Sequence, residues 1–218
     1  MQVTLSRPWL EFDLGAEMRV LSWSVNRPGF VTARRIIWRE VRNDDLSESL
    51  DVGDWLDEQL TTINASDAVA FLTSRDVTRF TTATAKAGRC TAECVATVGL
   101  SNAERVGHRV IHPAGHWGTI NIAVRVNCGL TRAGLIEAIS IATQARTAAV
   151  MDLDHMLPTG RATGTGTDCI AVAARPGPAL YAGLHTDIGE ALGAAVYKAT
   201  LQAGRDWVKE HAKSRGKA

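Results

Sequence analysis

Residues 118–127 carry the most regular pattern in the chain, because apolar and polar side chains alternate through them without a break. The apolar positions are Ile120, Ile122, Val124 and Val126. Successive side chains of a β-strand point to opposite faces, so the pattern predicts a strand with one face buried in a core. The other face carries Thr119, Asn121 and Arg125, which either meet water or line a cleft.

Further strands are predicted mainly in the first half of the chain. Apolar-rich runs at 9–14, 18–25 and 30–41 are separated by turn-forming residues, and 15–17 has the composition of a hairpin connection. Shorter strands are expected at 68–72 and 94–100, and a buried strand is expected at 169–174. The total is seven or eight strands.

Three helices are expected, and the two longest come late. Asp51 is a plausible N-cap for residues 51–63, Thr131 caps a helix to about residue 150, and the last helix starts at Thr186 or Asp187. This order predicts an α+β fold with a mixed, mainly antiparallel sheet covered by helices. No repeat or linker is visible, so residues 1–218 are expected to form a single domain with a frayed basic tail from about residue 205.

The overall composition excludes several partner classes. A formal net charge of +1 over 218 residues gives no global field that would favour nucleic acid or an anionic membrane surface. No window approaches the roughly 18 apolar residues of a membrane span, and no secretory signal is visible, so we expect a cytoplasmic protein. The four cysteines form neither a CxxC pair nor a zinc-type spacing, and Cys169 is expected to be a small core residue.

The glycine-rich run at 162–168 is the strongest candidate for a site, since its seven residues include no large side chain. Alternating glycines allow a tight bend and close approach of a ligand to the backbone. The run lacks the Gly-Lys-Ser/Thr of a phosphate loop, and it precedes a strand, unlike a dinucleotide fingerprint. The alternative is a purely structural tight turn leading into a core strand.

Each polar residue of this run has two interpretations. The N–H groups of Gly164, Gly166 and Thr167 suit an oxyanion hole. Asp168 could be a general base, or instead a salt-bridged or turn-capping carboxylate. Thr165 and Thr167 could be nucleophiles only beside a base, and they are otherwise turn residues.

Histidine offers weaker candidates. His185, just before a helix start, could act as an acid or base, or could be structural. The histidines at 108, 112 and 116 would align only on a helix, and Pro113 argues against one, so no metal site is predicted there.

Several of these segments together resemble the adenosylcobinamide amidohydrolases, which are corrinoid-salvage enzymes. The resemblance covers about residues 15–205. The matching segments, at 72–74, 96–102, 118–122, 143–146, 162–168 and 181–189, read LTS, ATVGLSN, GTINI, TQAR, ATGTGTD and YAGLHTDIG.

The resemblance implies hydrolysis of the amide between the corrin ring's propionyl side chain and its aminopropanol arm. The products would be adenosylcobyric acid and 1-amino-2-propanol, used in cobalamin synthesis. No cofactor or metal is implied beyond the cobalt corrin of the substrate itself, and assembly into a homo-oligomer is left open. Within the matching segments, Asp168 is the expected base, His185 the acid, and Thr165 and Thr167 the oxyanion or positioning residues. The expected substrate-binding residues are Thr119, Asn121, Gly164, Gly166, Asn102 and Gln144.

One position departs from the family pattern. The family commonly carries Thr-Glu-Ala-Lys where this chain has residues 143–146, so Gln144 replaces a carboxylate. We interpret the position as one that orients rather than reacts. Two other functions stay open: a corrinoid-binding or delivery protein without turnover, marked by Gln144, and an amidase or acyltransferase for another small substrate. A wide cleft could be lined by Trp9, Trp23, Trp38 or Trp117, although core packing is the ordinary role of each.

Overall fold

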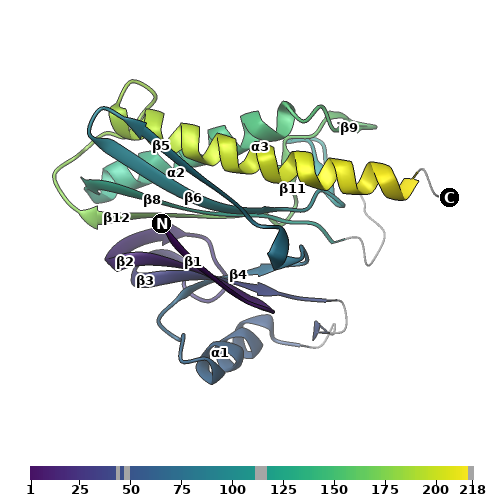
Figure 1. Cartoon of the computed structure of the whole chain (residues 1–218), viewed down its shortest axis with the longest axis horizontal. Helices are drawn as coiled ribbons and strands as arrows, with labels where there is room; N and C mark the ends of the chain where they lie inside the picture. Colours follow the sequence, from purple (N-terminus) through teal and green to yellow (C-terminus); the bar gives the residue numbers. More distant parts are fainter. Residues whose placement is uncertain (43–44, 47–49, 111–116, 216–218) are drawn as a thin grey trace.

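The computed structural model describes residues 1–42, 45–46, 50–110 and 117–215. An eight-stranded sheet folds over on itself, so that two layers of strands face each other and helices cover both outer faces (Figure 1). The strand order along the sheet is β4-β3-β2-β12-β8-β6-β5, with β1 paired to β2. The prediction of an α+β fold with a mixed, mainly antiparallel sheet is confirmed.

The first layer and its helix come from the N-terminal part of the chain. β1, β2 and β3 are antiparallel, whereas β4 runs parallel to β3. Helix α1 packs on the outer face through Leu56 and Leu60, and the side chain of Asp51 caps its first turn as predicted. The bounds are β1 Gln2–Ser6, β2 Trp9–Ser22, β3 Gly29–Glu40, α1 Val52–Thr62 and β4 Val69–Thr73.

The second layer contains the predicted alternating strand. β8 lies between β6, which is antiparallel to it, and β12, which is parallel to it. Helices α2 and α3 cover the outer face of this layer (Figure 1). The bounds are β5 Thr81–Ala87, β6 Cys90–Val98, β8 Ile120–Leu130, α2 Arg132–Met151, β12 Cys169–Pro176 and α3 Asp187–Arg215.

Short elements complete the chain between these. A three-residue 3₁₀ helix, η2, follows β4, and two-residue strands pair β7 with β11 and β9 with β10. Their bounds are η2 Val77–Arg79, β7 Ala103–Glu104, β9 Met156–Leu157, β10 Gly160–Arg161 and β11 Gly164–Thr165.

The two faces of β8 enter different cores. Its apolar set packs against α2 and α3, as the alternation predicted. The opposite set turns toward the first layer, where Ala123 joins a core with Phe12 and Trp38. There the Arg125 guanidinium lies over the Phe12 ring and its Nε donates to Glu93 at 2.5 Å. The polar face of β8 is therefore enclosed between two layers rather than exposed to solvent along its length.

Three predictions about local structure are wrong. The residues at 15–17 form no hairpin: β2 runs through them with a register irregularity between Asp13 and Met18, and Gly15 takes a φ of 74° that favours glycine. β5 was missed because its Thr-Ala-Lys sequence lacks large apolar side chains. The tail is not frayed from 205, since α3 continues to Arg215 and Trp207 is buried against the second-layer core.

Candidate functional site

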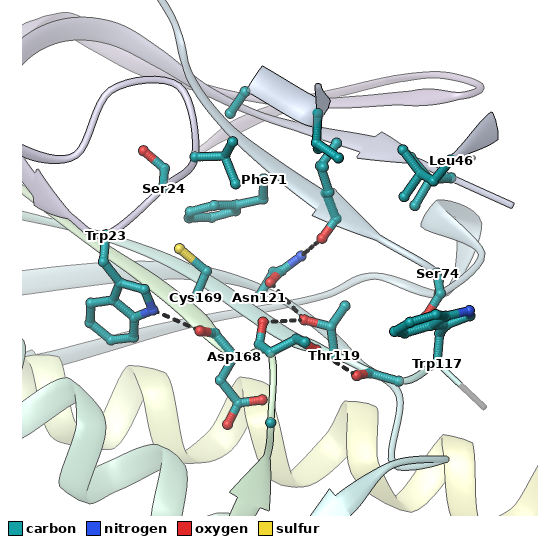
Figure 2. A pocket seen from close by; sticks show the side chains of 18 of the residues that line it. Trp23, Ser24, Leu46, Phe71, Ser74, Trp117, Thr119, Asn121, Asp168 and Cys169 are labelled. Atoms are coloured by element: carbon teal, nitrogen blue, oxygen red, sulfur yellow. Dashed lines mark hydrogen bonds between the residues drawn. The ribbon is translucent and has the colours of Figure 1, made fainter. Parts of the chain in front are cut away.

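A pocket of about 820 Å³ opens at one end of the gap between the two strand layers. Residues that follow β2 and β3, residues of β4 and residues at the start of β8 and β12 all line it, so five strands contribute to one pocket. Figure 2 shows the residues that line it. They include Trp23, Ser24, Phe71, Leu72, Ser74, Trp117, Gly118, Thr119, Asn121, Gly166, Thr167, Asp168 and Cys169.

Two tryptophans stand at opposite sides of this pocket (Figure 2). Trp23 is 47% exposed and Trp117 is 58% exposed, which is high for so large an apolar ring. Trp23 is also fixed in place, because its Nε1 donates to the backbone carbonyl of Asp168 at 2.7 Å. Neither of these two tryptophans therefore packs in the core, which is the ordinary role of the residue, whereas the fully buried Trp38 does.

The polar floor of the pocket is a connected set of hydrogen bonds (Figure 2). Asn121 Nδ2 donates to the Leu72 carbonyl at 2.6 Å and so joins β8 to β4. The Thr119 hydroxyl lies 3.1 Å from Asn121 Oδ1 and 2.9 Å from the Thr167 carbonyl, and the Thr167 hydroxyl donates to the Gly118 carbonyl at 2.8 Å. The structure thus brings Thr119 and Asn121 together with Thr167 of the glycine-rich turn at the pocket, although Thr167 lies 48 positions from Thr119 in the sequence.

Asp168 faces two ways. Its backbone lines the pocket, but its carboxylate points away toward the helices (Figure 2). Oδ2 accepts from Arg146 Nη1 at 2.5 Å and from the Thr165 N–H at 3.1 Å. Oδ1 accepts from the Thr165 hydroxyl at 2.5 Å and from the Ile120 N–H at 3.1 Å.

This environment favours the structural interpretation of Asp168. Burial raises the pKa of its carboxyl, while Arg146 and the bonds from Thr165 and Ile120 act in the opposite direction. With its side chain only 7% exposed and four donors in place, the carboxylate has no free path to a substrate in the pocket. It matches the salt-bridged, turn-capping alternative better than the general base.

Arg146 is the residue that sequence reasoning overlooked. It lies on α2, within the segment 143–146, in which the sequence analysis assigned a role only to Gln144. Its Nη1 binds both Asp168 and the Thr163 carbonyl, at 3.1 Å. The alternative of a salt-bridged carboxylate at Asp168, together with an arginine in the matched segment 143–146 of a predicted helix, was the signal that could have paired the two residues.

The glycine-rich turn offers backbone donors unequally. Gly164 belongs to β11, paired with Glu104, and is buried behind the pocket. Gly166 lines the pocket, and its N–H has no hydrogen-bond acceptor among the described residues. The Thr167 N–H has only a long contact of 3.4 Å to the Thr165 hydroxyl. Of the three predicted oxyanion donors, the N–H groups of Gly166 and Thr167 therefore belong to residues that line the pocket, whereas that of Gly164 does not.

His185 is at the wrong end of the molecule for the predicted role. β12 begins at the pocket with Cys169 and ends at Pro176, and His185 follows in an exposed segment before α3. The start of α3 lies against the β5–β6 turn, where the Asp187 carboxylate fills the space beside Gly88. His185 does not line the pocket, so the structure contradicts its assignment as the acid of this site.

Three further predicted residues lie outside the pocket. Gln144 is exposed on α2, which covers the opposite face of the second layer, so its change from a carboxylate does not alter the pocket lining. Thr165 supports Asp168 from behind. Asn102 is buried beside Gly118, and its Oδ1 lacks a partner among the described residues.

Cys169 is partly buried: it packs against the core that contains Phe12 and Trp38, as predicted, and it also lines the pocket. Burial raises the pKa of its thiol to about 12, which keeps it protonated. No cluster of His, Cys, Asp or Glu that could hold a metal occurs in the described part of the chain. His112 and His116 lie outside the described residues, so the prediction about them stays untested.

Comparison with known proteins identifies the family. The family model for adenosylcobinamide amidohydrolase matches residues 1–212. The chain belongs to this family. A curated relative, the uncharacterized protein MJ1613 of Methanocaldococcus jannaschii, is 37% identical over 97 residues, which span 43% of this chain and 38% of that protein. The alignment therefore covers well under half of the relative.

Two solved structures share the general arrangement at 11% identity. The PH0078 protein of Pyrococcus horikoshii OT3 covers 89% of this chain and 76% of its own, with a TM-score of 0.46. A beta-aminopeptidase of a Burkholderia species covers 89% and 78%, with a TM-score of 0.47. These likenesses carry no information about function. In the described residues no helix has both the length and the apolar character needed to cross a membrane.

Proposed function

We propose that this protein hydrolyses the amide linking the corrin ring to the aminopropanol arm of adenosylcobinamide, giving adenosylcobyric acid and 1-amino-2-propanol. One observation carries the proposal: the matched glycine-rich turn forms one wall of an open pocket of about 820 Å³. Pockets for small ligands span roughly 300–1,000 Å³, so this one is large enough for a major part of an extended ligand.

The lining suits a flat, amphipathic ligand with amide groups at its edge. Phe71, Leu72 and the two exposed tryptophans supply apolar and aromatic surface. Asn121, Ser74 and the other polar floor groups supply donors and acceptors that amides can use. These residues are proposed to bind and orient the corrinoid.

Hydrolysis requires a water oxygen to attack the amide carbon, the C–N bond to break and a proton to reach the departing amine. The negative charge that develops on the carbonyl oxygen needs donors that are already in place. We assign this role to the N–H groups of Gly166 and Thr167, because both residues line the pocket and neither N–H has a strong partner among the described residues. Thr119 and Asn121 are proposed to hold the amide or a neighbouring side-chain amide.

The test is incubation of the purified protein with adenosylcobinamide in water enriched in ¹⁸O, followed by mass spectrometry. Hydrolysis should give adenosylcobyric acid carrying one ¹⁸O, and release 1-amino-2-propanol. A corrinoid product with the mass of another acceptor in place of the aminopropanol, instead of the free acid, would indicate acyl transfer. Thr167→Val, which removes the hydroxyl but keeps the N–H, should retain more activity than Gly166→Pro, which removes a proposed donor.

A second function is favoured by one observation. Among the described residues that line the pocket none is a histidine or glutamate, and the carboxylate of Asp168 is already engaged. A corrinoid-binding or delivery protein would need no acid or base there. Corrinoid that stays bound and unchanged after prolonged incubation, measured by the absorbance retained with the protein on gel filtration, would establish this function instead.

A further inference from the structure

Arg146 and Asp168 form a buried ion pair directly behind the turn whose other side lines the pocket. We propose that they act as a positioning pair: the ion pair holds the backbone of residues 163–168 so that Gly166 and Thr167 are presented to the substrate. The effect on turnover rests on the proposed function, but the effect on the turn does not.

The pair ties together three separate segments. Arg146 comes from α2, Thr165 from the turn and the Ile120 N–H from the start of β8, and all three donate to the Asp168 carboxylate. Arg146 also binds the Thr163 carbonyl. The turn is thereby held at positions 163, 165 and 168, and the residues left between the last two anchors are the ones exposed to the pocket.

The sequence of the turn accommodates this pair. A Cβ on Gly164 would lie 1.8 Å from Arg146 Nη1 and 2.6 Å from Asp168 Oδ2, so no side chain fits there while the ion pair is formed. By contrast, a Cβ on Gly166 would meet nothing within 4 Å. The glycine at 164 is thus required by the pair, and the one at 166 is not required for packing.

Arg146 makes its contacts through a single donor atom rather than through the two-pronged face of its guanidinium group. One nitrogen, Nη1, makes both of its hydrogen bonds, whereas Nε is buried without a partner among the described residues. A lysine Nζ offers three donors at a single point. Lysine at position 146 should therefore be able to make the same two contacts. If two guanidinium nitrogens of Arg146 were needed, as in a bidentate ion pair, lysine could not substitute for it.

The energetics of the Arg146–Asp168 ion pair also indicate that it positions the turn rather than stabilises the fold. The side chains are 13% and 7% exposed, so the cost of removing both charges from water offsets much of their attraction. An ion pair of this kind contributes little net stability, but it fixes the geometry of whatever it connects. Here it connects a helix to the turn that carries the proposed oxyanion donors.

The first experiment compares Arg146→Lys, Arg146→Met and the wild type for kcat and KM on adenosylcobinamide, well below the melting temperature of each. We expect Lys to keep kcat within about threefold, and Met to lower it by about 100-fold with little change in KM, since misplacement of about 1 Å can cost that much. Arg132→Met, which removes an exposed arginine at the other end of α2, should leave both unchanged. Equal values for Lys and Met would overturn the inference.

The second experiment separates positioning from general-base catalysis. Asp168→Asn keeps the shape of the side chain and should lower kcat while leaving the form of the pH–rate profile unchanged. Disappearance of the acidic limb of that profile would assign Asp168 as the base and refute the positioning role. If Arg146→Met does not fold, Gly164→Ala displaces the pair without removing either charge and should also lower kcat.

A third measurement does not depend on turnover. Hydrogen exchange of peptides covering 160–170 should be faster in Arg146→Met than in the wild type or Arg146→Lys, with no change in the β5–β6 hairpin. If the wild type shows no hydrolysis, the proposed function fails and this comparison alone decides the positioning role. Unchanged exchange in the turn would reject it whatever the activity.

Discussion

The two ends of the layer formed by β8 and β12 are built for different purposes. At the open end, where both strands begin, polar side chains and a glycine-rich turn line a large pocket. At the closed end, backbone packs directly on backbone: a Cβ on Gly177 would lie 2.5 Å from the Cα of Gly129. A disulfide between Cys90 and Cys128 joins β6 to β8 at this same end.

The difference shows that a family motif does not by itself indicate a catalytic residue. The segment 162–168 lies at the open end, but the segment 181–189, which also resembles the family and falls within the matched residues 1–212, lies at the closed end. There Thr186 caps α3 by accepting from the Gly189 N–H at 3.0 Å, and Gly189 sits against the backbone of Gly183. Substitutions at the closed end should therefore change stability, and those at the open end should change substrate binding or turnover.

The largest effect is expected from Gly189→Ala. The new Cβ would lie 2.1 Å from the Gly183 carbonyl oxygen and 2.5 Å from that of Ala182, and neither backbone atom can move aside cheaply. We expect a loss of at least about 3 kcal/mol in the free energy of unfolding, measured by urea denaturation. Gly193→Ala is the matched control, because its Cβ would make an ordinary 3.5 Å contact in the same helix. Equal stability of the two variants would contradict the packing argument.

Removal of the disulfide should have the next largest effect. The double variant Cys90→Ala/Cys128→Ala opens a loop with a sequence separation of 38 residues, and should lose about 2–4 kcal/mol. A reductant should lower the melting temperature of the wild type but not that of the variant. KM should be unchanged at 25 °C, because both cysteines are distant from the pocket. An altered KM would show that the two ends are coupled.

Trp117→Ala tests the open end. Loss of an aromatic surface that is 58% exposed should cost little stability, but it should raise KM about tenfold, equivalent to about 1.4 kcal/mol of binding. Tyr181→Ala removes an aromatic ring that is 71% exposed at the closed end and should leave KM unchanged. Similar KM values for both variants would remove Trp117 from the proposed binding surface.

The smallest effect concerns an ion pair that joins α3 to the segment after β4. The hydrogen bond from Arg75 lowers the pKa of Glu210, and burial partly opposes it. A lowered folded-state pKa gives stability that is present above the unfolded-state value of about 4.3 and is lost as pH falls through the folded-state value. Glu210→Gln should therefore be less stable than the wild type at pH 7 by under about 1 kcal/mol, because Glu210 is one-third exposed. The difference in urea midpoint should vanish near pH 3, and persistence there would exclude this ion pair as its cause.

Sequence patterns predicted those parts of the fold that depend on local side-chain chemistry. The alternation in β8 and the caps at Asp51 and Thr131 are local and were confirmed. β5 and the continuity of β2 through Gly15 depend on pairing with distant strands, so the sequence alone did not indicate them.

Part of the candidate site was also predicted from the sequence. The family resemblance grouped the glycine-rich turn with Thr119 and Asn121, and all three line one pocket, although the sequence pattern alone left open whether the polar face of residues 118–127 meets water or a cleft. The orientation of the Asp168 side chain depends on which face of the layer it meets. The distance of His185 from the pocket depends on which end of β12 leads into the segment before α3. The presence of Trp23 and Trp117 at the pocket depends on how the two layers stack, which no local pattern encodes.

The origin of the pocket's walls has a consequence for how the protein can diversify. Residues 23–74 contribute one wall, whereas the turn, the floor and the ion pair come from residues 117–168. At the pocket these two stretches are joined by the hydrogen bonds from Trp23 to the Asp168 carbonyl and from Asn121 to the Leu72 carbonyl. Mutations in the earlier stretch can alter which molecules are accepted while the later stretch keeps its geometry, so selectivity and reactivity are free to evolve at separate rates.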